Sequence, residues 1–198
     1  MRARLAAACL VALAIAGCKT APPPAPVVGP GADAPWDLQR EQLGKLDRYS
    51  LNGRVAVAAN GQGFTASLRY AQSPGSSDLA LDGPLGIGGL RVAYSADELR
   101  MTNSKGVRLD GDAARADLER RLGFALPLGE LRWWLLGVPA PGEANIEETA
   151  GEIRAFTQNG WRVSINARAP GLGFALPQKL TAEREGARLK LLVENWQP

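Results

Sequence analysis

The sequence predicts a mainly β domain in which antiparallel strands are interrupted by a helical insert. Between residues 51 and 109, short runs alternate apolar and polar side chains, as in strands that bury one face. Turn-forming pairs such as Asn60-Gly61 and Lys105-Gly106 separate these runs. From Asp112 onward the apolar spacing changes to four residues, which is typical of a helix.

The first predicted element is a helix, because Trp36, Gln39, Leu43 and Leu46 fall on one helical face and Asn52-Gly53 can end it. A meander of strands follows. Its apolar face is predicted to carry, strand by strand, Leu51, Val55 and Val57; Phe64, Ala66, Leu68 and Tyr70; Leu79 and Leu81; Leu90, Val92 and Tyr94; Leu99 and Met101; and Val107 and Leu109.

The helical insert is predicted to begin at Asp112 as N-cap and to stop at Gly123. A second helix is expected from near Pro127 to just before Gly137. Strands resume near Ile153 and over residues 161–165, 179–184 and 188–196. The hexapeptide Leu-Gly-Phe-Ala-Leu-Pro occurs at 122–127 and at 172–177, and its differing flanks argue against a duplication.

The N-terminus is typical of an export signal. Arg2 and Arg4 precede an apolar run from Leu5 to Ile15, which is too short to span a bilayer as a helix. Ala16-Gly17-Cys18 resembles a bacterial lipobox, in which the cysteine is lipidated and becomes the new N-terminus. The alternative is an ordinary signal peptide that leaves Cys18 as an incidental thiol.

We therefore expect three segments: a signal peptide over 1–17, a lipidated Pro-rich tether over 18–35 and a folded domain over 36–198. By resemblance to lipoprotein sorting, Lys19 favours export to the outer membrane, where an aspartate would favour retention. Removal of residues 1–17 lowers the formal charge from +3 to +1, because two arginines and no acid are lost. The basic pI is therefore no argument for a nucleic-acid partner.

The residue types present exclude several kinds of catalysis. The chain has no histidine, which excludes a Ser-His-Asp triad and most zinc sites. The glycine-rich stretch from Gly83 to Gly89 lacks the Lys-Ser/Thr of a phosphate loop. Adjacent carboxylates, Asp110 with Asp112 and Glu147 with Glu148, are expected to be solvated turn and loop charges. We expect no enzyme activity, no cofactor and no metal.

One loop has two interpretations. Pro84, Leu85, Gly86 and Ile87 lie between two predicted strands, and the glycines there give Leu85 and Ile87 no packing partners. A single exposed apolar residue is common on protein surfaces. The other interpretation is an apolar wedge that inserts into a membrane.

Taken together, these residues resemble the LolB family of outer-membrane lipoproteins. The resemblance covers nearly the whole domain, with modest departures: Tyr70 stands where a tryptophan is common, and Ile165-Asn166 where a tyrosine is often found. The matching pieces, in chain order, are Trp36 with Leu46 and Tyr49, Gly53-Arg54-Val55-Ala56, Pro84-Leu85-Gly86, Leu126-Pro127-Leu128, Leu131-Arg132-Trp133-Trp134-Leu135-Leu136-Gly137-Val138-Pro139, Gln158-Asn159-Gly160-Trp161, Leu176-Pro177, and Leu189-Lys190-Leu191 to Asn195-Trp196.

The resemblance implies a strongly curved, incomplete antiparallel β-barrel of about eleven strands, with helices forming a lid over an apolar cavity. It implies a monomeric, lipid-anchored receptor on the periplasmic face of the outer membrane that accepts acylated lipoproteins from the periplasmic carrier LolA and inserts them. It also strengthens the membrane-wedge interpretation of Leu85. The alternative is an envelope lipoprotein that binds a lipid or another hydrophobic ligand and transfers nothing, and a further one is a structural lipoprotein with a filled core.

If a cavity exists, the alternation of the strands predicts its lining. Each of these side chains could equally fill an ordinary core, and Trp134 could belong to the lid or cap the sheet. The expected lining residues are Val55, Val57, Phe64, Ala66, Leu68, Leu79, Leu81, Val92, Tyr94 and Trp134. Arg54, Arg69 and Arg91 are candidates for donor recognition at the cavity rim, or they are ordinary solvated strand positions.

Overall fold

The computed structural model describes residues 29–83, 89–96 and 98–198. The predicted signal peptide, the lipidation site Cys18 and the loop residues Pro84 to Ile87 lie outside these described residues. Within the described ranges the chain forms one eleven-stranded antiparallel sheet and three helices. The expected mainly β fold of about eleven strands is therefore confirmed.

The sheet consists of two meanders. The strands of the first are β1 (Tyr49–Ala59), β2 (Gln62–Ser73), β3 (Ser76–Asp82), β4 (Leu90–Ser95), β5 (Glu98–Thr102) and β6 (Arg108–Asp110). The strands of the second are β7 (Asn145–Thr149), β8 (Glu152–Gln158), β9 (Trp161–Gly171), β10 (Phe174–Arg184) and β11 (Ala187–Gln197). The helices are α1 (Trp36–Lys45), α2 (Gly111–Leu122) and α3 (Leu131–Trp134).

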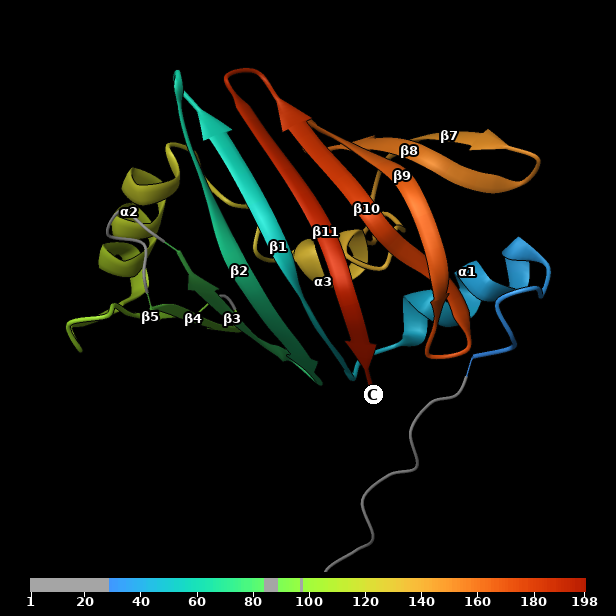
Figure 1. The fold of residues 1–198 in the computed structure, drawn as a ribbon, viewed down its shortest axis with the longest axis horizontal. Helices are drawn as coiled ribbons and strands as arrows, with labels where there is room; N and C mark the ends of the chain where they lie inside the picture. Colours follow the sequence, from blue (N-terminus) through green and yellow to red (C-terminus); the bar gives the residue numbers. More distant parts are fainter. Residues whose placement is uncertain (1–28, 84–88, 97) are drawn as a thin grey trace, which may run out of the picture.

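The two meanders join where β1 pairs with β11, so the first and last strands lie side by side in the middle of the sheet. The order across the sheet is β6-β5-β4-β3-β2-β1-β11-β10-β9-β8-β7. In the described part of the chain no ladder joins the edge strands β6 and β7, so the barrel stays open. Figure 1 shows the two halves of the curved sheet splayed apart, with α3 behind the central strands.

One face of the sheet carries the core. Along β1 every second residue from Tyr49 to Ala59 is buried, and along β2 the buried positions run from Ala66 to Gln72. The chain between β6 and β7 leaves one edge, crosses this apolar face and enters the other edge. We call residues 111–144, which include α2 and α3, the strap. The strap supplies Leu118, Leu122 and Leu136 to the same buried cluster.

Helix α1 is fastened to the second meander by a buried cation. The Arg168 guanidinium lies 4.2 Å from the centre of the Trp36 ring and its Nε is 2.8 Å from Glu152 Oε1. Its Nη1 and Nη2 donate hydrogen bonds to the carbonyls of Ala175 and Ile153. Burial lowers the pKa of Arg168 to about 10, so the side chain is still a cation at neutral pH.

Some predicted boundaries are wrong. The first helix ends at Lys45, and Gly53 lies inside β1, at a bulge against β11. The helix after β6 begins two residues earlier than predicted, with Asp110 in the N-cap position in place of Asp112. Gly123 does stop it, with a φ of 82°. The second predicted helix is reduced to one turn, α3, because the chain around Pro127 forms turns.

The second meander is longer than predicted. Strand β7 was not expected, because all five of its residues are exposed and show no alternation. Strand β10 begins at Phe174, and its ladder to β9 shifts register at Pro177. The repeated hexapeptide adopts two structures. Residues 122–127 end α2 and lie within the strap, while residues 172–177 turn from β9 into β10. This difference agrees with the absence of a duplication.

Gly53 allows the two central strands to approach closely. A Cβ built on it would lie 2.2 Å from the carbonyl oxygen of Leu192, so the backbone of β11 would have to move. We expect Gly53→Ala to lower the free energy of unfolding by about 1–3 kcal/mol, measured by urea denaturation. Gly44→Ala is the matched control. Its Cβ would meet nothing within 4 Å, and a helical Gly→Ala change should stabilise by up to about 1 kcal/mol. Equal losses in both variants would contradict the close approach.

Candidate functional site

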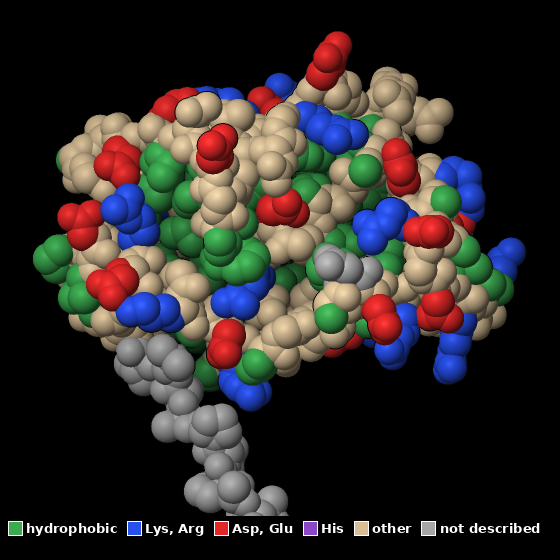
Figure 2. Space-filling view, turned by 180° about the vertical axis from the view of Figure 1, so that it is seen from behind, with side chains coloured by type: hydrophobic (Ala, Val, Ile, Leu, Met, Phe, Trp, Pro, Cys, Tyr) green, Lys and Arg blue, Asp and Glu red, His purple; other side chains and the backbone are tan. Residues whose placement is uncertain are grey.

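The candidate site is an apolar cavity between the inner face of the sheet and the strap. Its volume is about 90 Å³, and its lining contains no charged side chain. The sheet contributes Val55, Val57, Leu68, Tyr70, Leu79, Leu81, Leu180, Ala182, Leu189 and Leu191. The strap contributes Leu122, Leu126, Pro127, Leu131, Trp134 and Leu135. Figure 2 shows the molecule from this side, with apolar side chains gathered towards the middle and many charged ones around them.

Strong polar contacts hold the strap at its C-terminal end. Gln158 of β8 is 4% exposed, and its Oε1 accepts hydrogen bonds from Trp134 Nε1 at 2.9 Å and from the Ala140 amide at 3.0 Å. Its Nε2 donates to the Ala140 carbonyl at 3.0 Å. The Trp134 ring also packs against Phe156 and Trp161, at centroid distances of 6.2 and 6.4 Å. These contacts fix α3 over the second meander.

Polar contacts also reach the rest of the strap. Asn159 Nδ2 donates to Glu130 Oε1 at 2.6 Å, and Arg132 Nη2 donates to the Leu46 carbonyl at 3.4 Å. Asn60, in the turn between β1 and β2, donates from Nδ2 to the Gly123 carbonyl at 3.1 Å. The Tyr49 hydroxyl donates to the Arg132 carbonyl. Between these points, Leu126, Leu131 and Leu135 contact the sheet through apolar atoms. Around Leu126 and Pro127 the strap is therefore held mainly by apolar packing, which has no directional requirement.

Tyr70 lines the cavity and packs against a second buried tyrosine, Tyr49. The Tyr70 hydroxyl donates to Gln72 Oε1 at 2.6 Å, and the rings of Tyr49 and Tyr70 lie 5.8 Å apart. Burial raises the pKa of Tyr70 to about 12 and that of Tyr49 well above its usual value of 10. Both phenols therefore stay neutral at physiological pH, and the cavity remains uncharged.

The structure brings together six of the ten residues expected to line a cavity: Val55, Val57, Leu68, Leu79, Leu81 and Trp134. The other four have different surroundings. Ala66 and Val92 are buried on the same face but do not reach the cavity, and Tyr94 packs half-buried at the edge of the core. Phe64 is half-buried and borders a separate surface pocket next to the end of α2.

Sequence reasoning missed the contribution of the last strands and of the strap. Leu180, Ala182, Leu189 and Leu191 alternate along β10 and β11, and this pattern was available. What the pattern lacked was the pairing of β11 with β1, which places these side chains beside Val55 and Val57. The contacts of Leu126 and Leu131 depend on the path of the strap, for which the sequence carries no comparable signal.

The three arginines proposed for donor recognition lie on the outer face of the sheet, and none of them lines the apolar cavity. Arg54 Nε is 2.8 Å from Glu194 Oε1, and Arg69 Nη2 is 2.6 Å from Asp82 Oδ2. Arg91 shares a large surface groove with Arg69. Their positions correspond to the solvated strand positions that were the alternative.

Across the described ranges, no group of three or more His, Cys, Asp or Glu side chains could hold a metal ion. No helix of those ranges has the length and hydropathy needed to cross a membrane. The apolar cavity is therefore the feature that best distinguishes the described part of the chain.

Comparison with known families agrees with this architecture. The family model described as "Outer membrane lipoprotein LolB" matches residues 47–196, from just before β1 to the last residue but one of β11. The chain belongs to the LolB family.

Relatives in the LolB family align over the full chain. The outer-membrane lipoprotein LolB of Stutzerimonas stutzeri is 32% identical over 98% of this chain and 95% of its own length. That of Pseudomonas aeruginosa is 28% identical, over 100% of this chain and 98% of its own. A DUF1329 family protein from Desulfovibrio piger has a similar fold, with a TM-score of 0.50 and 10% identity over 80% of this chain and 88% of its own.

The buried tyrosines predict a pH dependence of stability. Tyr70 has a raised pKa in the folded state, so its contribution is fully present below pH 10 and is lost as the pH rises from about 10 to 12. We expect the free energy of unfolding to fall by up to about 3 kcal/mol over that range. Urea denaturation at pH 8.5, 10 and 11.5 measures it. Tyr70→Phe should lose less stability over the same interval, and an unchanged pH dependence in this variant would contradict the assignment.

Proposed function

We propose that this protein accepts acylated lipoproteins from the carrier LolA in its apolar cavity and inserts them into the outer membrane without an energy source. The observation that carries the proposal is the uncharged cavity enclosed between the open sheet and the strap, in a chain of the LolB family. The relatives that support it are themselves named outer-membrane lipoproteins. In this role the protein is a transport receptor and not an enzyme.

The energetics of acyl chains explain why a cavity is needed. Each buried CH₂ contributes about 0.8 kcal/mol, so the three chains of a lipoprotein would cost tens of kcal/mol if exposed to water. The chains must therefore be covered at every step between two membranes. Without a nucleotide site, transfer follows a gradient of affinity, from the carrier to this receptor and from the receptor to the bilayer.

The cavity must widen to do this work. Its 90 Å³ is well below the roughly 300–1,000 Å³ of ordinary ligand pockets. The strap around Leu126 and Pro127 can move away from the sheet, because it contacts the sheet through apolar atoms. Incoming acyl chains would replace those contacts with equivalent ones.

The attachment to the membrane follows from the expected lipid at Cys18. The backbone amides of Gly29 and Gly31 donate hydrogen bonds to the carbonyls of Leu172 and Gly173. The chain is therefore fixed to the sheet from Gly29 onward, beside the turn between β9 and β10. The eleven residues from 18 to 28, at about 3.1 Å each when extended, would span about 34 Å. Strand β1, with 11 residues, is about 36 Å long. The extended tether is therefore nearly as long as this strand.

This reach matters for the proposed wedge at Leu85. Strand β3 runs towards the end of the sheet that carries the turn between β1 and β2, because Asp82 pairs with Ser67. The tether begins at the opposite end, beside the turn between β9 and β10. A shorter tether would hold the end of β3 away from the bilayer. A tether nearly as long as a strand allows the lipid at Cys18 and the end of β3 to approach the same membrane.

The test of the proposed function is transfer from a loaded carrier. LolA carrying a radiolabelled lipoprotein is mixed with the purified protein and then with liposomes. We expect the label to move first to this protein and then to the liposomes, in the absence of nucleotide. Binding of free fatty acid without any uptake of label from LolA would favour the alternative of a hydrophobic-ligand-binding lipoprotein, and would overturn the proposal.

Two variants separate anchoring from delivery. Cys18→Ala should accept cargo normally but be lost from the outer membrane on fractionation, because it lacks the lipid. Leu85→Glu should accept cargo from LolA but release at least about tenfold less into liposomes, because a carboxylate resists entry into an apolar phase. Leu38→Glu, at an exposed apolar residue of α1, is the matched control and should deliver normally. Normal delivery by Leu85→Glu would remove this residue from the mechanism.

A further inference from the structure

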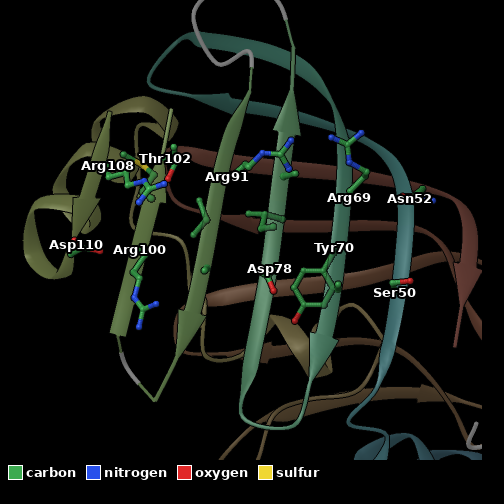
Figure 3. Close-up of a pocket in the computed structure, with 16 residues that line it drawn as sticks. Ser50, Asn52, Arg69, Tyr70, Asp78, Arg91, Arg100, Thr102, Arg108 and Asp110 are labelled. Carbon is green, nitrogen blue, oxygen red and sulfur yellow. The ribbon is translucent and has the colours of Figure 1, made fainter. Parts of the chain in front are cut away.

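The outer face of the first meander contains a groove that the proposed function does not use. Its volume is about 750 Å³, and residues from β1 to β6 line it. Figure 3 shows Arg69, Arg91 and Arg108 at nearly one level across the strands, with Asp78, Arg100 and Asp110 below them. The groove is separated from the apolar cavity by the thickness of the sheet.

The strand register places the arginines in a row. Arg69 pairs with Ala80, which pairs with Arg91, and Arg91 pairs with Thr102, which pairs with Arg108. An arginine therefore emerges from every second strand, at β2, β4 and β6. Since neighbouring strands are about 4.8 Å apart, successive arginines leave the sheet about 10 Å apart. We call Arg69, Arg91 and Arg108 the arginine row.

Small side chains keep the groove open. Ala80 and Thr102 stand between members of the arginine row, and Ala71 and Ala93 lie in the row below. A large side chain at any of these positions would fill the space. The right-handed twist of neighbouring strands also makes such a surface concave along one diagonal. The alanine floor at Ala80 is only 9% exposed.

The groove has an excess of positive charge. Its lining contains four guanidinium groups, from the arginine row and Arg100, against the two carboxylates of Asp78 and Asp110. Among the described residues, Arg91 and Arg108 form no ion pair. Arg69 pairs with Asp82 and Arg100 with Glu98, but these side chains are between 42% and 73% exposed, and such pairs contribute little in water. All four guanidinium groups are therefore available to an anionic ligand.

We propose that this groove binds an extended acidic segment of a partner protein. The concavity favours a protruding chain, because a flat bilayer would meet the rim and leave the alanine floor empty. The tether of this chain does not supply such a segment, since residues 18–28 contain no acidic side chain. Guanidinium groups bind carboxylates through two parallel hydrogen bonds, which suits glutamate side chains presented in a line.

The spacing of the arginine row suggests a suitable probe. A polyproline II helix has three residues per turn and rises about 3.1 Å per residue, so every third side chain lies on one side at intervals of about 9.3 Å. A fluorescein-labelled peptide with four Glu-Pro-Pro repeats therefore presents carboxylates at nearly the spacing of the row. A Gln-Pro-Pro peptide of equal length is the neutral control.

The experiment measures binding of the probe to the full chain by fluorescence anisotropy at low ionic strength. We expect the Glu-Pro-Pro peptide to bind, the Gln-Pro-Pro peptide not to bind, and affinity to fall with added salt. The double variant Arg91→Glu/Arg108→Glu should bind at least about tenfold more weakly. The milder Arg91→Gln/Arg108→Gln should show an intermediate loss and guards against misfolding of the first.

The matched control is Arg54→Glu/Arg188→Glu. It changes the net charge equally and also lies on the outer face, on β1 and β11, but outside the groove. It should weaken binding by less than about threefold. Equal weakening in both double variants would reduce the effect to net charge and overturn the proposal. So would a protein that fails to bind the peptide but binds phosphatidylglycerol vesicles through the arginine row. The probe requires neither cargo nor LolA, so the result is independent of the proposed function.

Discussion

The structure depends on covering the apolar face of a sheet whose two edges do not pair with each other. A closed barrel would bury its interior by itself, but here β6 and β7 end at opposite edges of the sheet. The chain solves this with the strap, which must run from one edge to the other and therefore has to cross the apolar face. Covering the face and connecting the two meanders are thus done by the same segment. The small cavity is the space that remains because the apolar surfaces of the sheet and the strap are not fully complementary in shape.

The sheet also separates two environments. Alternation along each strand places Val55 and Leu68 in the dry interior, while Arg54 and Arg69 face water. The inner face offers contacts without direction, which suit flexible acyl chains that must later leave. The outer face offers charged groups at fixed spacing, which suit recognition of a particular surface. Because the sheet lies between the two faces, a ligand bound to one face need not displace a ligand bound to the other.

Much of the fold could be predicted from the sequence, because period-two alternation runs along strands that bury one face, such as β1 and β2. The prediction missed β7, where Glu147 and Glu148 are both exposed and no side-chain alternation marks a strand. For α3 the apolar spacing suggested a longer helix, but the chain forms a single helical turn. The residues that line the cavity were harder to predict than the strands. Phe64 and Val92 share the inner face with Val57, but only the path of the strap decides which of these side chains borders empty space. That path depends on distant contacts such as Gln158 with Trp134.

The strap is joined to both edge strands, and this limits how the interior can change size. A flap fixed at one end could swing clear, but a segment fixed at both ends can only bow outward or let the two margins of the arc move. The contour length of the strap then limits how wide the space between the strap and the sheet can become. Lengthening or shortening the loop around Pro127 would change the size of the ligand that fits into the cavity, without changing the sheet residues that contact the ligand.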